Sequence, residues 1–319
     1  MVMSVRHFLT LTDFTSEEIL RLVELSAKFK SKRKMGNRVD HMLKDKSIAL
    51  IFQKPSTRTR ASLSVAIKEL GGFPVTFNWN ELQLGRGESI ADTARVLSRY
   101  FDAIIARVYS HNDLLEMARY SSVPVLNALS DMFHPMQAIS DLFTIKEKLG
   151  RIKGIKLAFI GDGTSNVLNS LLIAGSKVGM HIVIACPKEY SPRSNVLSLA
   201  RSFAQNSGAI IEITEDPVKA VRTADIIYTD VFVSMGFEAE REKRLKVFYP
   251  KYSVTKALLE KCEKKDYIFM HCLPAHRGEE VEDEVMDDIK HSVVFDQAEN
   301  RLHSSKAILT YVLGDRVWD

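Results

Sequence analysis

A group of hydroxyl and guanidinium side chains stands where an apolar run gives way to a helix-like segment. The stretch KPSTRTR, residues 54–60, follows the apolar run SIALIF. A helix N-terminus presents unpaired backbone N–H groups and a partial positive charge, which suits a phosphate. Ser56, Thr57 and Thr59 can add hydroxyl donors. Arg58 adds a planar fork that matches phosphate oxygens. The stretch predicts an anion site, because helix capping alone would account for only one of the hydroxyls.

Other polar segments also follow apolar runs along the chain. Arg107 closes the run AIIARV, and SDMFHPMQ, with His134 and Gln137, follows VLNAL. In the second half, GDGTSN, DVFVSMG and HCLPAHRGE occupy equivalent places. Because ligands of open parallel sheets bind beyond the carboxyl ends of the strands, these segments predict that polar chemistry gathers there.

The segment GDGTSN invites comparison with a nucleotide-binding turn, since Gly161 and Gly163 stand between a strand-like run and a helix-like one. The dinucleotide fingerprint requires a third glycine three residues later and an acidic residue about 20 residues further on. Here Asn166 takes the third place and the next strand ends in ACPK. The pattern therefore disfavours NAD, and Asn166 could instead hydrogen-bond a polar substrate.

Several of these residues also have an ordinary structural interpretation. His271 and Cys272 are adjacent and would point to opposite faces of a strand, and no CxxC or HExxH accompanies them, so no metal site is predicted. His134 could be a hydrogen-bonded core histidine, Asp230 could cap a helix, and Ser234 could belong to a simple turn. The residues alone leave these alternatives open.

The elements that must position these residues follow from hydrophobic periodicity. Short apolar, β-branched runs alternate with amphipathic segments such as the one carrying Leu63, Ala66, Ile67 and Leu70, which typifies an α/β protein with buried, mainly parallel sheets. The predicted strands are 47–52, 103–108, 123–129, 155–161, 181–186, 208–214, 224–230, 267–273 and 292–295.

The pattern restarts near residue 150, after a helical stretch that carries Ile139, Leu142 and Phe143. We therefore expect two domains, each a mainly parallel sheet flanked by helices: residues 1–148 and residues 149–302. The last run, AENRLHSSKAILTYVL, is helical, and residues 303–319 are expected to pack back on the first domain.

Composition limits the classes of protein to be considered. The net charge of +4 is small for 319 residues and both signs are interspersed, which disfavours nucleic acid as a partner. No stretch approaches the roughly 20 apolar residues of a membrane span. The start of the chain resembles no leader, and the three scattered cysteines do not suggest a disulfide framework, so we expect a cytoplasmic protein with reduced thiols.

Taken together, the motifs STRTR, HPMQ, DVFVSMG and HCLPAHRGEEV resemble the aspartate/ornithine carbamoyltransferase family over nearly the whole chain. The SMG and HCLP elements resemble those of the members that act on ornithine. The resemblance implies transfer of the carbamoyl group of carbamoyl phosphate to the δ-amine of L-ornithine, giving L-citrulline and phosphate, in arginine biosynthesis or, in reverse, in arginine catabolism. It implies a carbamoyl phosphate-binding first domain and an ornithine-binding second domain, with no metal and no organic cofactor.

The resemblance also implies roles for the matching positions. The implied carbamoyl phosphate contacts are Ser56, Thr57, Arg58, Thr59, Gln83, Arg107, His134, Gln137, Cys272, Leu273 and Arg301. Of these, the implied catalytic residues are Arg107, His134, Gln137, Cys272 and Arg301. The implied ornithine contacts are Asn166, Asp230, Ser234 and Met235, the last through its backbone. Gln83 matches a position that reaches a neighbouring subunit's site, which implies a homo-oligomer built from trimers.

One position departs from the family pattern. Where the family often has two adjacent asparagines, this chain has Ser165 and Asn166, so a contact of the first would be altered. Two other hypotheses remain: a carbamoyltransferase for another amine such as putrescine and, outside the class, a nucleotide-binding dehydrogenase or a non-catalytic phosphate-binding protein.

Overall fold

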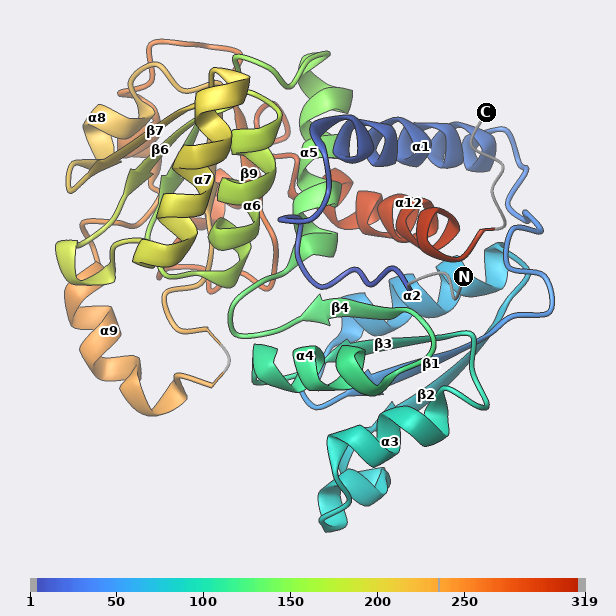
Figure 1. Cartoon of the computed structure of the whole chain (residues 1–319). Helices are drawn as coiled ribbons and strands as arrows, with labels where there is room; N and C mark the ends of the chain where they lie inside the picture. The colour runs from blue at the N-terminus through green and yellow to red at the C-terminus, as the bar shows by residue number, and fades with distance from the viewer. Residues whose placement is uncertain (1–4, 235, 315–319) are drawn as a thin grey trace. The chain divides into compact units, whose positions relative to one another are not determined.

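The computed structural model describes residues 5–234 and 236–314, which form two compact units. The first unit contains the residues up to Phe143 and those from Glu299 onward, and the second runs from Thr144 to Ala298 (Figure 1). Each unit has its own parallel sheet flanked by helices, which confirms the predicted α/β class. Arg301, which the predicted boundary placed in the second domain, lies in the first unit.

The sheet of the first unit has four parallel strands in the order β2-β1-β3-β4. Its strands are β1 (Ser47–Phe52), β2 (Phe73–Asn78), β3 (Ala103–Arg107) and β4 (Val125–Leu129). Every residue of the central strand β3 is buried, as expected in a sheet covered on both faces. The edge strand β4 is buried as well, and its Leu126 forms a bridge with Phe8. Because the strands are parallel, the segments that follow β1, β3 and β4 leave the sheet at the same edge.

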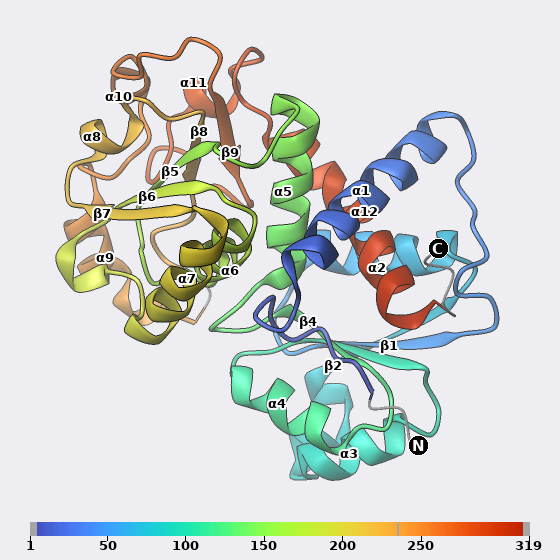
Figure 2. The ribbon, with the colours of Figure 1, turned by 45° about the horizontal axis from the view of Figure 1, so that its top comes forward.

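Helices cover both faces of this sheet (Figure 2). One face carries α3 (Ile90–Leu97) and α4 (His111–Tyr120), whose apolar residues pack against those of β1 and β3. The other face carries α2 (Thr57–Glu69), with α1 (Ser16–Lys34) and the C-terminal part of α12 (Val294–Leu313) beyond it. Leu63, Ala66, Ile67 and Leu70 are all fully buried, which confirms the predicted apolar face of α2.

The C-terminal helix α12 returns to the first unit, as predicted. Its side chains reach two helices there, α1 and α2: Lys30 Nζ of α1 donates to Asn300 Oδ1 at 2.8 Å, and Lys306 Nζ lies 3.4 Å from Glu69 Oε2 of α2. Further along, the Tyr311 hydroxyl donates to Glu18. The N- and C-terminal parts of the chain are therefore fastened together within this unit.

The sheet of the second unit has five parallel strands in the order β7-β6-β5-β8-β9. They are β5 (Lys156–Ile160), β6 (His181–Ala185), β7 (Ile210–Thr214), β8 (Ile226–Thr229) and β9 (Ile268–His271). One face carries α6 (Asn166–Lys177) and α7 (Ser194–Ser207), and the other carries α8 (Pro217–Val221), α10 (Lys256–Leu259) and α11 (Asp283–Met286) (Figure 2). Helix α5 (Pro135–Leu149) contains the boundary between the two units.

The structure corrects the predicted strands in two places: one assignment is wrong and one strand was missed. The expected strand at 292–295 forms only an isolated bridge between Ser292 and Phe269, and α12 begins at Val294. A short apolar run cannot by itself distinguish a strand from the first turn of a helix, and here the long helical pattern downstream decides. Conversely, β2 was not predicted: it contains Pro74 and is half exposed, and an edge strand tolerates both.

Across the residues that the structure describes, no helix combines the length and apolar content needed to cross a bilayer.

Candidate active site

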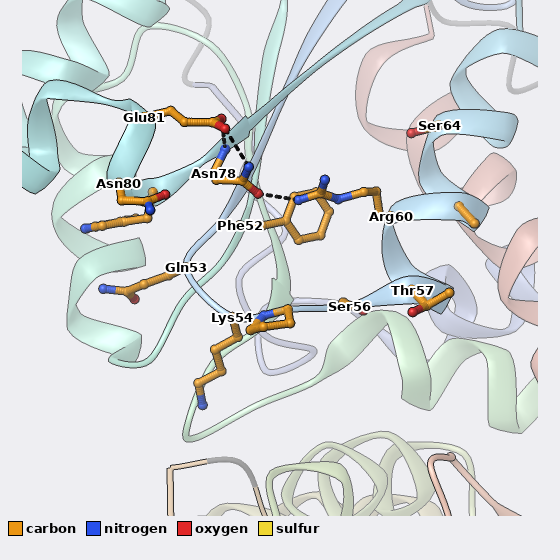
Figure 3. Close-up of a pocket in the computed structure, with 13 residues that line it drawn as sticks. Phe52, Gln53, Lys54, Ser56, Thr57, Arg60, Ser64, Asn78, Asn80 and Glu81 are labelled. Carbon is orange, nitrogen blue, oxygen red and sulfur yellow. Dashed lines mark hydrogen bonds between the residues drawn. The ribbon is translucent and has the colours of Figure 1, made fainter.

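The loop between β1 and α2 forms an open, polar helix start. Ser56 is the N-cap of α2, and its hydroxyl accepts a hydrogen bond from the Thr59 amide at 3.2 Å, so the capping role is real. Thr57 is exposed and Arg58 half exposed, whereas Thr59 is buried. Residues 52–57 line one side of a pocket of about 920 Å³ (Figure 3). The Ser56 hydroxyl is thus used by the cap, and Thr57 still presents its hydroxyl at an accessible helix N-terminus.

Arg60, the second arginine of this stretch, turns away from the loop toward β2 (Figure 3). Its guanidinium donates to Asn78 Oδ1 at 2.5 Å and lies 4.8 Å from the centroid of the Phe52 ring. Arg60 therefore joins the start of α2 to the ends of β1 and β2.

Lys54 is a residue that the sequence reasoning quoted but did not assign. Its side chain is buried, lines the same pocket, and carries its ammonium 4.4 Å from the centroid of the Tyr109 ring. A positive charge immediately before the helix start adds to the potential that attracts an anion. In the sequence, only the position of Lys54 next to Pro55 and Ser56 indicated that it could belong to the site.

Arg301 of α12 is the centre of a buried polar cluster in the first unit. Its guanidinium donates to Gln137 Oε1 at 2.6 Å and to Thr59 Oγ1 at 3.3 Å, and it lies 3.5 Å from His134 Nε2. These three partners come from α2, from the residue that precedes α5, and from the first turn of α5. Predicted residues that are up to 242 positions apart in the sequence therefore meet around one side chain.

His134 in this cluster is held neutral. Burial lowers its pKa well below the ordinary value, and the positive charges of Arg301 and Arg107 lower it further. Because a guanidinium offers only donors, Nε2 of His134 faces Arg301 as an acceptor and the imidazole proton lies on Nδ1. Arg107, which ends β3, is itself only 5% exposed, so two buried arginines lie near one neutral histidine.

Gln137 is oriented from its other end by Asp141, one turn further along α5. Its Nε2 donates to Asp141 Oδ1 at 2.8 Å while its Oε1 accepts from Arg301. The amide orientation is thus fixed by a carboxylate, which only accepts, and a guanidinium, which only donates. Gln83 lies outside this cluster, exposed, in the short 3-10 segment η2 (Gln83–Arg86).

A second group of predicted residues meets in the second unit around Asp230, which follows β8 and is only 7% exposed. Its Oδ1 accepts from the Val231 amide at 2.8 Å and from Cys272 Sγ at 3.1 Å. Its Oδ2 accepts from Ser165 Oγ at 2.9 Å. The cap interpretation of Asp230 is therefore wrong, and the departure from the family pattern, Ser165, gives this carboxylate a hydroxyl donor.

The neighbours of Asp230 come from the turns after β5 and β9. Ser165 is also the N-cap of α6, and Asn166 is its first helical residue. After β9, Leu273 adopts φ 59°, and its amide donates to His271 Nδ1 at 2.9 Å. Ser234 is half buried beyond Val231, and Met235 lies outside the described residues.

His271 and Cys272 do point to different partners, as the alternation of a strand requires. His271 is fully buried with Nε2 3.2 Å from Glu280 Oε1, whereas Cys272 faces Asp230. Among the described residues, ligand atoms of His276, Glu279 and Glu280 do lie within 4.8 Å of one another. Glu279 already forms an ion pair with Arg241, and the buried Glu280 lies beside His271, so both carboxylates already have protein partners.

Comparison with known proteins agrees with this geometry. Both units are parallel α/β, and the first combines a buried arginine–histidine–glutamine cluster with a helix N-terminus. Residues 6–147 match the carbamoyl-P binding domain of aspartate/ornithine carbamoyltransferase, and residues 153–312 match its Asp/Orn binding domain. The chain belongs to the aspartate/ornithine carbamoyltransferase family.

Within that family, similar proteins carry one particular name. "Ornithine carbamoyltransferase, anabolic" of Pyrococcus furiosus is 54% identical over 309 residues, covering 97% of this chain and 96% of that protein. The solved structure of ornithine carbamoyltransferase from Pyrococcus furiosus superposes with a TM-score of 0.92 and covers 97% of each chain. The anabolic ornithine carbamoyltransferase from Campylobacter jejuni, 43% identical, has a TM-score of 0.89 and covers 97% of this chain and 99% of that chain.

Proposed function

We propose that this chain is an ornithine carbamoyltransferase, which transfers the carbamoyl group of carbamoyl phosphate to the δ-amine of L-ornithine and releases L-citrulline and phosphate. The observation that carries the proposal is the Arg301 cluster, because it gathers the donors that an acyl-transfer reaction requires. Family membership supplies the substrate class. The reaction serves arginine biosynthesis.

The first unit supplies the carbamoyl phosphate site in this proposal. Phosphate oxygens bind the amides and hydroxyls at the start of α2, from Ser56 to Thr59, with Arg58 as the paired cation. The macrodipole of the 13-residue helix α2 favours an anion at that position. Lys54, buried beside the same loop, adds a second positive charge.

The carbamoyl carbonyl binds the cluster of Arg107, His134, Gln137 and Arg301. Attack by an amine places negative charge on that carbonyl oxygen, and preorganised donors stabilise it at the moment it forms. A neutral His134 suits this role, since its Nδ1–H donates without adding a third charge to two neighbouring arginines. The tetrahedral intermediate then collapses, the C–O bond to phosphate breaks, and phosphate leaves with the electron pair.

The second unit supplies the ornithine site. The Asp230 carboxylate pairs with the α-ammonium group, while Asn166, Ser234 and the Met235 backbone hold the α-carboxylate end. Cys272 and Leu273, after β9, lie toward the reacting amine. The δ-amine, with an ordinary pKa of about 10, must lose a proton before it attacks. Asp230 and the Cys272 thiol, which are in contact at 3.1 Å, form the surroundings in which the δ-amine loses its proton.

The remaining assignments belong to the same proposal. The enzyme uses no metal or organic cofactor and works in the cytoplasm. It forms a homo-oligomer built from trimers, in which the exposed Gln83 completes a neighbouring subunit's carbamoyl phosphate site. Two inactive variants, Gln83→Ala and Arg301→Met, test this: when mixed after dissociation they should regain activity by forming sites from intact parts. A mixture that stays inactive while remaining trimeric would remove Gln83 from the site.

The direct test is citrulline formation from carbamoyl phosphate and L-ornithine by the purified protein. Replacement of Arg58 by alanine should weaken carbamoyl phosphate binding by more than about 1.5 kcal/mol, the lower end for a hydrogen bond to a charged group. Arg95→Gln, which removes an exposed arginine of α3 from its surface ion pair with Asp92, is the matched control. A folded wild-type protein that forms no citrulline would refute the proposal. Faster carbamoylation of putrescine than of ornithine would make putrescine the acceptor substrate in place of ornithine.

A further inference from the structure

The second unit contains a buried arginine that the proposed reaction does not use. Arg244, in α9 (Arg241–Phe248), is only 3% exposed. Its Nη1 donates to Asp162 Oδ2 at 2.8 Å and to the Phe232 carbonyl at 3.0 Å, and its Nε lies 3.3 Å from Glu240. Removing a charge from water is costly unless the geometry is fixed by partners, so this guanidinium is held in one place by the groups around it.

Through Asp162, Arg244 is connected to the turn that begins α6. Asp162 is also 3% exposed, and its two oxygens have separate partners. Oδ2 binds Arg244, whereas Oδ1 accepts from the amide and the hydroxyl of Thr164 at 2.8 and 2.7 Å. The next residue, Ser165, is the N-cap of α6 and the donor to Asp230. One carboxylate therefore couples Arg244 to the turn that carries Ser165.

At its other side, Arg244 contacts the chain on both flanks of Ser234. It binds the carbonyl of Phe232, two residues before Ser234, and its guanidinium lies 4.6 Å from the ring centroid of Phe237, three residues after it. The Phe237 amide in turn donates to the Ser234 carbonyl at 3.0 Å. The Phe232 ring stacks on Phe248 of the same helix as Arg244. The position of Ser234 thus depends on contacts to α9.

We propose that Arg244 is a positioning residue that fixes, through Asp162 and Phe237, the two segments that receive the α-amino-acid end of the substrate. The inference rests on the proposed function, since it deepens the assignment of Asn166, Asp230 and Ser234 to that end. Arg244 does not contact the substrate. It determines how accurately the Ser165 turn and the Ser234 segment are placed relative to each other, and hence which amines with an α-amino-acid end are accepted.

A purely structural ion pair would have a different effect from a positioning residue. Loss of folded protein lowers the apparent kcat and leaves the KM for each substrate unchanged. Misplaced contacts to the α-amino-acid end, the head group, raise the KM for ornithine alone. L-Norvaline, which has the head group of ornithine and lacks the δ-amine, isolates head-group recognition from the chemistry. Carbamoyl phosphate, which is assigned to the first unit, gives the internal control.

The experiment compares Arg244→Met, Arg244→Lys and the double variant Asp162→Asn/Arg244→Met with the wild type. The double variant removes both buried charges together, which avoids an unpaired carboxylate. Phe237→Leu changes a ring that is 37% exposed and should fold normally. Arg241→Met is the matched control, because Arg241 lies one turn earlier on α9 and binds Glu279 instead.

We expect the KM for ornithine and the inhibition constant of norvaline to rise in parallel, by about tenfold or more, in Arg244→Met and in the double variant. Arg244→Lys and Phe237→Leu should show smaller rises, and Arg241→Met none. The KM for carbamoyl phosphate should not change in any of them. An unchanged norvaline constant in the folded double variant or in Phe237→Leu, or an equal rise in Arg241→Met, would overturn the inference. A wild-type enzyme that forms no citrulline would instead refute the proposed function itself.

Discussion

Replacement of Asp230 by asparagine separates the charge of this residue from its structural contacts. The three donors that hold Asp230 are the Val231 amide, the Cys272 thiol and the Ser165 hydroxyl. An asparagine Oδ1 can still accept from the first two, and the Ser165 hydroxyl can rotate to accept from the new amide. The packing around residue 230 should therefore survive, and the variant should unfold at nearly the same urea concentration as the wild type.

What the substitution removes is the negative charge that pairs with the α-ammonium of ornithine. A hydrogen bond to a charged group contributes about 1.5–3 kcal/mol, so the KM for ornithine should rise about 10- to 150-fold. The KM for carbamoyl phosphate should stay the same, because its predicted contacts are concentrated in the first unit. Steady-state citrulline assays, with each substrate varied at saturating concentrations of the other, measure both quantities.

The matched control is Asp283→Asn, an aspartate of the same unit in an exposed ion pair with Arg277. It should leave both KM values unchanged. If Asp230→Asn is folded and its KM for ornithine equals that of the wild type, Asp230 does not receive the α-ammonium and the assignment of the second unit is wrong.

Three other substitutions give distinct outcomes. Arg301→Met should raise the KM for carbamoyl phosphate and lower kcat while leaving norvaline affinity unchanged; loss of norvaline affinity would contradict a role confined to the first unit. Gly163→Ala should lower the free energy of unfolding in urea by about 2 kcal/mol, because its Cβ would lie 2.4 Å from the Tyr190 carbonyl oxygen; an unchanged unfolding midpoint would contradict this close packing. Burial lowers the pKa of His303 from 6.5 to about 4, so protonation favours the unfolded chain, and up to about 3 kcal/mol of stability should be lost as pH falls through that interval. His303→Gln should flatten this part of the stability profile, and an identical slope in both proteins would refute the assignment.

Much of the fold was accessible from the sequence because central parallel strands are buried on both faces and read as continuous apolar runs. The central strands β3 and β5 are of this kind, and the edge strand β4 is equally buried. The helix carrying Ile139, Leu142 and Phe143 was equally clear. The edge strand β2 lacked the signal, since its residues are half exposed. The apolar run at 292–295 gave a false strand prediction, because the first turn of α12 is apolar as well.

The site was predictable at the level of which residues belong to it, and less so in how they interact. Position at or just after the end of a strand pointed to Arg107 and Asp230, and the motif STRTR pointed to the start of α2. That Arg301 binds Gln137 and Thr59, or that Ser165 donates to Asp230, depends on tertiary contacts between distant segments. Arg244 gave no pattern of its own, since a single cation in a helix is usually solvated, and only its position before Pro55 and Ser56 marked Lys54.

The return of α12 to the first unit has a consequence for the order in which a growing chain can fold. The second unit is one continuous stretch, so all of its residues are available while the C-terminal segment is still unsynthesised. The first unit also needs Asn300, Arg301 and Lys306, which follow the last residue of the second unit in the chain. Until these residues are made, the buried side chains of Lys30 and Gln137 lack their partners Asn300 and Arg301. A ribosome-bound chain should therefore be able to complete its second unit before the buried Arg301 cluster of the first unit can form.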